Sequence, residues 1–520
     1  MEVGMAVALE HPESVENAVE LGELSSRAAA EAYIGKICFK QGPPALIGAE
    51  LEWLTVQGER SAAGPSAAPR PQLTVLADAL GPYAPRSIAP DSPALPLPGG
   101  SRVTIEPGGQ IELSSAPYAT AARLCDELRA DARMLRALLE SRSIRTVSGA
   151  ADADRRARRL LRLPRYRAME QAFAGIGPFG KLMMCNTAAT QVSVDAGADR
   201  GDIAARWVAL YAMGPALLAA FACSPALHGA PAGDWVSQRM RAWLRLDPAR
   251  TRPPVHEWLD PVASYGRWAL DVPLLCVRRP DGPPGDWAAP PGATFADWLS
   301  GALDDEIGRR PDAGDLDYHL TTLFPPVRAS GHLEIRYLDA QPGDDWTVPI
   351  HVFDALLSSP AVVAEATAVA APVAGRWLDA ARNGLADSQI RAVAVALLTL
   401  AADHARGSTS ATEIGAAIRR CSSGRTPVEE SATRTTSSGG GRVLSGERPA
   451  STDARAPSDD GVPSTRDQAS HRPAPSDSGR VVSGERPAHT DARAPSGGVP
   501  SIRDQMSHEP APSVSGRYRR

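Results

Sequence analysis

The sequence lacks the cysteine spacing of a zinc-binding or disulfide-rich protein. Its six cysteines are widely separated, and no two form a Cys-x-x-Cys pair. The histidines do not stand at the spacing typical of a zinc site, and a chain of 520 residues is not a small secreted scaffold. We therefore expect reduced thiols in a cytoplasmic protein.

Long apolar runs and a basic N-terminal segment are also missing. No run of apolar residues approaches the roughly 18 that a membrane-spanning helix requires. The chain opens with Glu2, Glu10, Glu13 and Glu16, which is the wrong charge for a signal peptide. These two absences favour a soluble protein without a membrane partner.

Lysine is scarce, since only three of the 55 basic residues are lysines. We attribute this bias to a GC-rich genome and infer no function from it. The net charge of the chain is −5, and an arginine-rich C-terminal region leaves the rest more acidic still. An acidic body argues against a nucleic-acid partner, which would require a basic face.

Large apolar residues are almost absent from 408–520, a segment of mainly Ser, Gly, Pro, Arg and Ala whose only aromatic residue is Tyr518. Such a composition does not bury enough surface to offset the entropy lost on ordering. Within this segment 441–476 is repeated as 479–513, and two copies without apolar periodicity do not make a solenoid. We predict one folded domain over 1–407 and a disordered tail over 408–520 with a duplicated segment.

The folded domain alternates between helical and strand-like patterns. Apolar periodicity predicts helices over 120–139, 155–173 and 202–221, and a helical pair over 360–404 that breaks near Asn383. Strands are predicted over 47–54, 182–195 and 333–339. Residues 57–101, rich in Pro, Ala, Gly and Ser, indicate a long surface insertion.

The first run with chemical content is 47–54 (Ile-Gly-Ala-Glu-Leu-Glu-Trp-Leu). The two-residue period of a strand places Glu50 and Glu52 on one face and the apolar residues on the other. Neighbouring carboxylates repel each other unless a cation neutralises them, and such oxygen ligands suit Mg²⁺. The alternative is an exposed edge strand with solvated acids.

A hairpin pattern follows at 103–113, where two strand-like runs flank a Pro-Gly-Gly turn. Glu106 enters the turn. Gln110, Glu112 and Ser114 share one face of the returning strand, with Ile111 on the opposite face. Acids on one face and apolar residues behind thus occur a second time.

Two further strands repeat the arrangement. Gln191 stands on the polar face of one, and Glu334 and Arg336 share the polar face of the other. An acid and an arginine on one face can bind metal and phosphate respectively, although a cross-strand ion pair is an equally simple interpretation of these two residues. Four such strands predict an antiparallel sheet whose polar face is a multi-metal nucleotide site.

The run 175–182 (Gly-Ile-Gly-Pro-Phe-Gly-Lys-Leu) matches a glycine-rich nucleotide loop only superficially. It follows a predicted helix instead of a strand, and Leu182 stands where a P-loop needs a hydroxyl. We interpret it as a tight turn into the next strand.

Taken together, the motifs resemble those of the glutamate-cysteine ligases, in particular the actinobacterial branch that begins ergothioneine synthesis. The resemblance rests on 48–52 (Gly-Ala-Glu-Leu-Glu), 106–112 (Glu-Pro-Gly-Gly-Gln-Ile-Glu), 184–187 (Met-Cys-Asn-Thr) with Gln191, 221–225 (Phe-Ala-Cys-Ser-Pro), and 319–328 (His-Leu-Thr-Thr-Leu-Phe-Pro-Pro-Val-Arg) leading to 334–336 (Glu-Ile-Arg). It covers roughly 47–342 and leaves the tail unexplained.

The resemblance implies an α+β catalytic domain, a glutamine-synthetase-like funnel of antiparallel sheet with helices packed outside. It also implies ATP-dependent joining of the glutamate γ-carboxylate to the amine of cysteine through a γ-glutamyl phosphate. The implied site residues are Glu50, Glu52, Glu106, Glu112, Glu334 and Gln191 for Mg²⁺, Arg336 for catalysis at the phosphate, and Arg239, Arg241 and Arg328 for the substrates.

The chain departs from this pattern at Ser193 and Cys223, where relatives often carry asparagine. A carboxylate–amine ligase with another acceptor therefore stays open as an alternative. So does a non-catalytic scaffold that senses nucleotide.

Overall fold

The computed structural model describes residues 24, 26–58, 68–253, 260–279 and 286–431. All of them belong to the first of two units of the chain, which ends at Val443. The duplicated segment of the tail lies outside the described residues.

Seven strands form one antiparallel sheet in the order β2-β3-β1-β5-β7-β6, with β4 paired to the far end of β1. The strands are β1 (Ile47–Gln57), β2 (Arg102–Ile105), β3 (Ile111–Ser114), β4 (Ile144–Val147), β5 (Ala189–Val194), β6 (Val327–Ala329) and β7 (Leu333–Asp339). The predicted antiparallel sheet of an α+β fold is confirmed.

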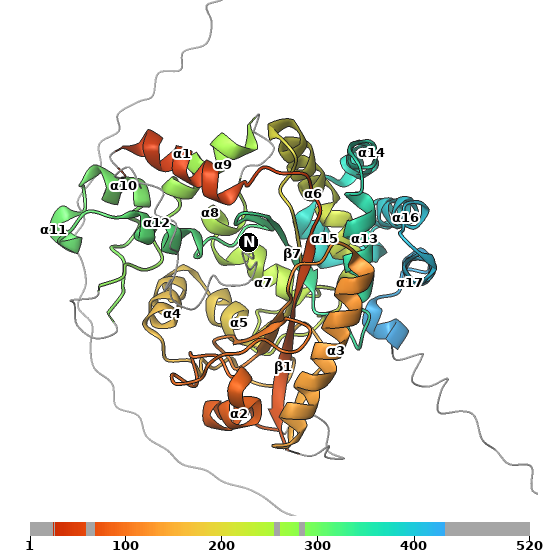
Figure 1. The fold of residues 1–520 in the computed structure, drawn as a ribbon, viewed down its shortest axis with the longest axis horizontal. Coiled ribbons are helices and arrows are strands. Elements are labelled where there is room, and N and C mark those ends of the chain that lie inside the picture. Colours follow the sequence, from red (N-terminus) through yellow and green to blue (C-terminus); the bar gives the residue numbers. More distant parts are fainter. Residues whose placement is uncertain (1–23, 25, 59–67, 254–259, 280–285, 432–520) are drawn as a thin grey trace, which may run out of the picture. The chain divides into compact units, whose positions relative to one another are not determined.

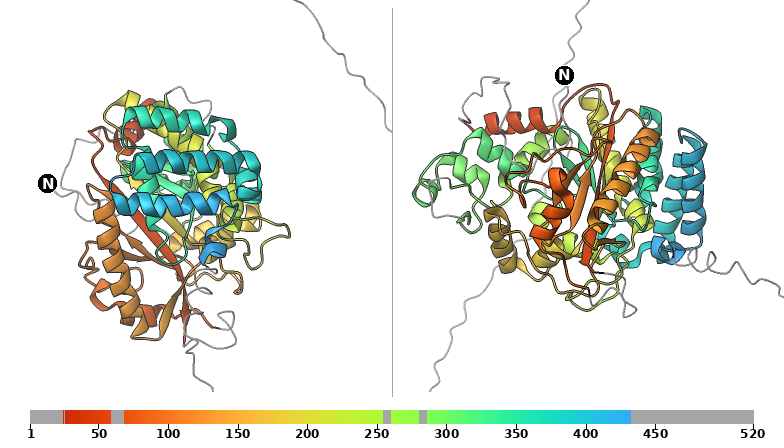
Figure 2. Two further views of the ribbon diagram at one scale, coloured as in Figure 1. Left: turned by 90° about the vertical axis from the view of Figure 1, so that its right-hand side faces the viewer. Right: turned by 60° about the horizontal axis from the view of Figure 1, so that its bottom comes forward.

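Helices surround this sheet (Figure 1). They are α1 (Arg27–Cys38), α2 (Leu73–Leu80), α3 (Ala121–Glu140), α4 (Pro164–Ile176), α5 (Phe179–Asn186), α6 (Arg200–Phe221), α7 (Gln238–Leu246), α8 (Pro248–Thr251), α9 (Pro261–Asp271), α10 (Phe295–Ser300), α11 (Asp304–Ile307), α12 (Ala313–Leu320), α13 (Thr347–Leu356), α14 (Pro360–Ala370), α15 (Trp377–Asn383), α16 (Ser388–Asp403) and α17 (Ser408–Ser422). Figure 2 shows α14, α16 and α17 side by side on one flank, and α3 running along β1.

The alternation along β1 is the one predicted. Ala49, Leu51 and Trp53 are 3%, 2% and 6% exposed and join the hydrophobic core. Glu50 and Glu52 point to the other face of the sheet. Because each side of the strand meets a different environment, a slip of one residue would bury both carboxylates in the core.

Helix α6 is the centre of the apolar layer. By length and composition it is apolar enough to cross a membrane, as are two bent helix pairs, so the prediction that no run approaches that length is wrong. However, 78% of its most apolar 18-residue stretch is buried inside the protein.

Helix α6 packs against β7, where the Tyr337 hydroxyl donates to the Leu210 carbonyl at 3.2 Å. At Gly214 an added Cβ would meet the Trp377 ring at 1.9 Å, so glycine is required for this contact.

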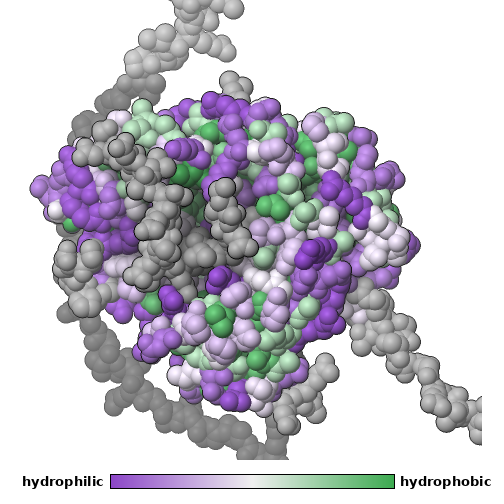
Figure 3. Space-filling model, in the orientation of Figure 1, coloured by the Kyte–Doolittle hydropathy of each residue, from purple (hydrophilic) through white to green (hydrophobic). Residues whose placement is uncertain are grey.

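Large hydrophobic side chains also reach the surface. The exposed ones are Leu46, Leu95, Leu163, Ile176, Val208 and Val428. On the face seen in Figure 3, hydrophobic residues occur singly or in small groups among hydrophilic ones. Single exposed apolar residues are ordinary on a globular protein.

Two secondary-structure predictions are wrong in part. Residues 182–186 belong to helix α5, and only β5 forms the predicted strand. All of them are buried, so their side chains carry no periodicity that separates helix from strand. Helix α4 starts only at Pro164, because proline suits the first helical turn and keeps the preceding residue extended. The glycine-rich run at 175–182 therefore joins two helices, unlike a P-loop.

The segment 57–101 is not a surface insertion where it is described. Helix α2 lies within it, and Leu76 and Leu80 are fully buried against the core. Leu97 is 2% exposed. The prediction rested on proline and glycine content, and it missed these buried leucines. A few buried apolar residues are enough to hold such a segment against the folded domain.

The predicted start of the tail at Ser408 is also wrong. Residues Ser408–Ser422 form helix α17, whose Ile414 and Cys421 are fully buried. The Arg420 guanidinium donates to the Ala220 carbonyl at the end of α6, at 2.8 Å. Two apolar anchors and one buried arginine thus attach a helix whose overall composition is polar.

Candidate active site

A cavity of about 480 Å³ lies on the polar face of the sheet. Three helices contribute to its wall opposite the sheet: α4 with Tyr166, α5 with Met183 and α7 with Trp243. Nine of the ten predicted site residues line it, namely Glu50, Glu52, Glu106, Glu112, Gln191, Arg239, Arg328, Glu334 and Arg336. The size is typical of a small-molecule site.

Strand pairing brings the acids of β1 next to Gln191. Glu50 is the cross-strand partner of Gln191 in the β1–β5 pairing, and on the other side of β5 the pairing with β7 shifts register between Thr190 and Val192. The Gln191 amide donates to Glu50 at 2.9 Å and to Glu52 at 3.3 Å. The other oxygen of Glu52 accepts the Ala189 N–H at 2.9 Å. One amide thus bridges the two carboxylates.

The β2–β3 hairpin brings in the next acids. Glu112 is the cross-strand partner of Glu52 and accepts hydrogen bonds from Thr104 (2.7 Å) and Ser114 (3.1 Å). Glu106 precedes the turn, which packs so closely against helix α5 that an added Cβ at Gly108 would lie 2.2 Å from the Cys185 carbonyl oxygen. The prediction of a hairpin with acids on one face is confirmed.

Glu334 has a different environment. Arg328, its partner on β6, donates to it twice, from Nε at 2.7 Å and from Nη2 at 3.1 Å. Arg336 donates to the same carboxylate from Nη1. Glu334 and Arg336 thus form the ion pair considered as an alternative, but within β7; the cross-strand partner of Glu334 is Arg328, and all three residues line the cavity.

Electrostatics divide the five acids into two groups. Burial, reinforced by the repulsion of neighbouring carboxylates, raises the pKa of Glu52 and of Glu112 to about 8 and raises that of Glu50 well above its usual range. Burial also raises the pKa of Glu106. Glu334 is buried too, yet Arg328 and Arg336 outweigh the burial and lower its pKa to about 2.

The acids share the cavity without converging on one point. Among the described residues no three His, Cys, Asp or Glu side chains are grouped so that they could hold a metal ion. Their chemistry nevertheless fits a hard divalent cation, because every candidate donor is an oxygen. Gln191 Oε1 is buried and has no hydrogen-bond partner in the described part of the chain, so an acceptor beside two carboxylates is left for a cation.

Arg239 reaches the cavity from α7 and is 2% exposed. Its guanidinium lies over the Trp243 ring at 5.3 Å, and that of Arg336 lies over the same ring at 5.4 Å. Two cationic groups thus lie against one indole, and both favour the ionised form of Glu52 on β1.

Arg241, the tenth predicted residue, does not line the cavity. Its guanidinium donates to the carbonyls of Pro231 and Ala232, at 2.6 and 3.1 Å, and lies over the Trp235 ring. Arg239 and Arg241 are two positions apart on one helix, so they face different directions. Helical geometry therefore separates two arginines that the sequence analysis treated alike.

Sequence reasoning missed several residues of the wall. Arg165 on α4 lines the cavity and donates to Thr321 at 2.7 and 2.9 Å. Its position in an arginine-rich run gave no sign of burial. Trp243, in contrast, stands four residues after Arg239 on a helix, and that spacing would have indicated the contact.

Comparison with known proteins is consistent with this site. The model of glutamate-cysteine ligase family 2 matches residues 46–443. The glutamate–cysteine ligase EgtA of Mycolicibacterium smegmatis is 38% identical over 387 residues, which is 74% of this chain and 86% of the relative. EgtA of Mycobacterium tuberculosis is 37% identical over 385 residues, 73% of this chain and 84% of the relative.

More distant similarities are also found. The chloroplastic glutamate–cysteine ligase of Medicago truncatula is 33% identical over 248 residues, 47% of this chain and 48% of the relative. Among solved structures, the ligase PafA in complex with the ubiquitin-like protein Pup aligns with a TM-score of 0.38 and 9% identity, over 77% of this chain and 71% of that one. A TM-score this low carries no inference about function.

The family match includes the sheet, the cavity and helix α17, and the resemblance drawn from the motifs is confirmed. The chain belongs to glutamate-cysteine ligase family 2.

Proposed function

We propose that the protein uses ATP to join the γ-carboxylate of glutamate to the amine of cysteine, in the cytoplasm and as a step of ergothioneine synthesis. The observation that carries this proposal is one cavity whose lining combines five carboxylates with six arginines. Relatives named glutamate–cysteine ligase EgtA support the choice of substrates.

In this proposal the donors for Mg²⁺ are Glu50, Glu52, Glu106, Glu112, Glu334 and Gln191. When bound, Mg²⁺ supplies positive charge that offsets both the buried carboxylates and the phosphates of ATP. The raised pKa of Glu52 and Glu112 supports this assignment, because a nearby cation would favour the ionised form of each.

Arg336 is proposed to contact the transferred phosphoryl group. One of its donors is held by Glu334, while its Nε is buried with no hydrogen-bond partner among the described residues. A guanidinium fixed by a carboxylate is preorganised, and preorganised charge stabilises a transition state without a reorganisation cost.

The reaction needs no nucleophile from the protein. An oxygen of the glutamate γ-carboxylate attacks the γ-phosphorus of ATP, the bond from that phosphorus to ADP breaks, and ADP leaves with its electron pair. The neutral amine of cysteine, having released its ammonium proton to water, then attacks the acyl carbon, phosphate departs, and the amine loses a second proton. None of the six cysteines of the chain lines the cavity, which is consistent with this scheme.

Arg239 and Arg328 are proposed to bind substrate carboxylates. Arg328 already donates twice to Glu334, so much of its hydrogen-bonding capacity is committed. Arg239 has no carboxylate hydrogen-bonded to its guanidinium in the described part of the chain, which favours it as the principal carboxylate-binding group. Arg241 is not part of the proposal because its guanidinium is occupied outside the cavity.

The finer fold assignment is also a proposal. We infer that the sheet is the curved, glutamine-synthetase-like funnel, with nucleotide at one end and amino acids at the other. The acidic β1–β3 side and the arginine-rich α7–β7 side of the cavity support such a polarity. An experimental structure with bound nucleotide tests it, and nucleotide outside this cavity would contradict it.

The function is tested with purified protein, Mg-ATP, glutamate and a panel of amines that includes cysteine. We expect ADP release that requires both glutamate and cysteine, and a product with the mass of γ-glutamylcysteine. ADP release with a different amine would identify another carboxylate–amine ligase. Tight nucleotide binding without turnover would favour the nucleotide-sensing scaffold.

A further inference from the structure

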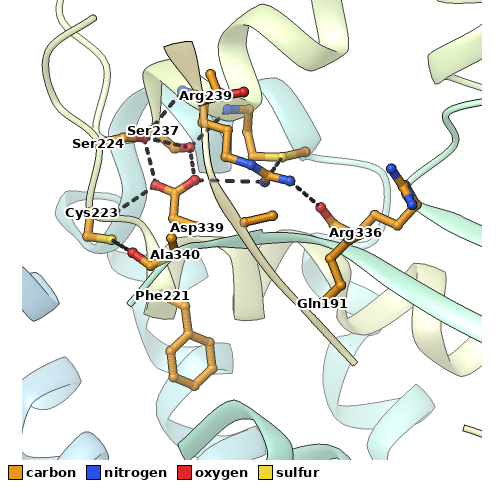
Figure 4. Close-up of polar contacts among 12 residues, drawn as sticks. Gln191, Phe221, Cys223, Ser224, Ser237, Arg239, Arg336, Asp339 and Ala340 are labelled. Atoms are coloured by element: carbon orange, nitrogen blue, oxygen red, sulfur yellow. Dashed lines mark hydrogen bonds and ion pairs between the residues drawn. The ribbon is translucent and has the colours of Figure 1, made fainter. Parts of the chain in front are cut away.

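Behind the cavity, Asp339 is held in a network of hydrogen bonds on the far side of Arg239 (Figure 4). We propose that Asp339 is a positioning residue that fixes the Arg239 guanidinium for the carboxylate of the glutamate substrate. The inference rests on the proposed function and adds to it a residue that does not line the cavity.

The Asp339 carboxylate is 1% exposed and is fully occupied. Its Oδ2 accepts the Ser224 hydroxyl at 2.7 Å and the Cys223 N–H at 2.9 Å, and its Oδ1 accepts the Ser237 hydroxyl at 2.9 Å. Three short hydrogen bonds from two segments leave this side chain a single orientation. Its charge is therefore fixed in space before any ligand binds.

Arg239 is the cation that this charge faces. The Arg239 Nη1 lies 3.9 Å from Asp339 Oδ1, and both side chains are at least 98% buried. The Ser224 hydroxyl also accepts the backbone N–H of Arg239 at 3.2 Å, so one serine contacts both partners. Asp339 is the acid that acts most strongly on Arg239, ahead of Glu52, and a buried charge that loses such a partner is destabilised, so the position of the guanidinium depends on Asp339.

The path of Arg239 into the cavity uses an open edge of the sheet. Beyond Val327 and Ile335 the pairing is one-sided, because the Arg336 N–H donates to the Pro326 carbonyl at 2.9 Å while Pro326 has no N–H to donate to the Arg336 carbonyl. The Arg239 Nη2 donates to that carbonyl, on Arg336, at 2.8 Å. Three groups therefore hold the guanidinium: the Asp339 carboxylate, the Arg336 carbonyl and the Trp243 ring. The guanidinium still faces the cavity.

The test compares Asp339→Asn with wild type in steady-state kinetics of the full chain. Asparagine keeps the size and removes the charge, so we expect the KM for glutamate to rise about tenfold or more, with the KM for ATP and kcat within about threefold. Asp131→Asn is the matched control, because Asp131 is also 1% exposed and also lies outside the cavity lining, but its carboxylate accepts the backbone N–H groups of Gly99 and Ser101 instead of facing Arg239. That control is expected to leave the KM for glutamate unchanged.

A double-mutant cycle separates positioning from a general loss of structure. Arg239→Lys is expected to raise the KM for glutamate, and Asp339→Asn is expected to add little to it, because Asp339 acts through Arg239. Additive effects would overturn the proposal. A rise in the KM for ATP instead of glutamate would also overturn it.

If Asp339→Asn does not fold, Ser224→Ala decides the question. It removes one hydrogen bond to the carboxylate and one from the Arg239 backbone, and a rise of about threefold in the KM for glutamate is expected. An unchanged KM in a folded variant, with wild type active, overturns the positioning role alone. A wild-type protein that does not join glutamate to cysteine overturns the proposed function, and the positioning role with it.

Discussion

The two sides of the cavity treat buried carboxylates in opposite ways. On β1 and β3, Glu50, Glu52 and Glu112 share the polar face, and burial first and neighbouring carboxylates second raise their pKa values, with Glu106 acting on both Glu52 and Glu112. On β7, Glu334 lies between two arginines, and its pKa is lowered to about 2. The carboxylates of β1 and β3 need added positive charge to ionise together, whereas Glu334 is already neutralised by Arg328 and Arg336.

This difference indicates where a cation is needed. A carboxylate that is already paired with two guanidinium groups gains little from a metal ion. Carboxylates that repel one another gain most, since a divalent cation removes the repulsion and favours the ionised forms together. The comparison therefore assigns the stronger metal dependence to the β1–β3 side, and the following experiments test it.

The largest effect is expected on activity. Replacing Glu50 by Gln should lower kcat/KM by at least about 100-fold, because it removes a charge that would hold Mg²⁺ at the phosphates. Initial rates of ADP release measure this. Glu170→Gln is the matched control, since Glu170 pairs with Arg159 and Lys181 and does not line the cavity. Equal rates for Glu50→Gln and the control would contradict the metal assignment.

The next effect concerns stability without metal, where the two sides should respond with opposite signs. Glu334→Gln leaves Arg328 and Arg336 without their shared carboxylate and should lower the free energy of unfolding by about 3 kcal/mol. Glu112→Gln removes one of several repelling carboxylates and should raise it by about 1 kcal/mol. Urea unfolding in EDTA measures the change for both variants. Changes of the same sign would contradict the proposed difference between the two sides of the cavity.

A smaller effect concerns pH. The pKa of Glu52 and of Glu112 is about 8 in the folded protein, above the ordinary value of about 4.3, so the folded state binds more protons between these limits. Stability without metal should therefore fall as pH rises from 6 to 8, by on the order of 2 kcal/mol for each of the two groups. The Glu52→Gln/Glu112→Gln variant should lose less. Thermal unfolding at the two pH values, with and without Mg²⁺, measures this, and Mg²⁺ should stabilise wild type more at pH 8.

The smallest effect is expected outside the cavity. Truncation after residue 431 should leave kcat/KM within about twofold, because the removed composition has little apolar surface to contribute. Truncation after Arg406 is the sharper comparison, since it also removes α17 with its buried Ile414 and Cys421 and should lower the melting temperature. A large loss of activity in the first truncation would mean that the tail contributes to the site.

Much of the sheet could be predicted because strand alternation is local. Glu50 and Glu52 lie opposite Leu51 whatever the rest of the chain does, and the Pro-Gly-Gly turn brings Glu112 back beside Thr104, whereas the contact of Glu112 with Glu52 comes from the long-range pairing of β1 with β3. Predictions failed where a run is buried on all sides, as at 182–186, since no periodicity then distinguishes helix from strand. They also failed where a few anchors attach a polar segment, as in α17.

The sequence by itself determined which residues carry charge, which strands have one polar face, and the family to which the chain belongs. Only the tertiary structure decided which charges meet. It paired Glu334 with Arg328 and Arg336, left the acids of β1 and β3 facing one another, and separated Arg239 from Arg241 although both stand on α7. The physical reason is that electrostatic energy depends on distance and burial, and these arise only when strands distant along the chain come together.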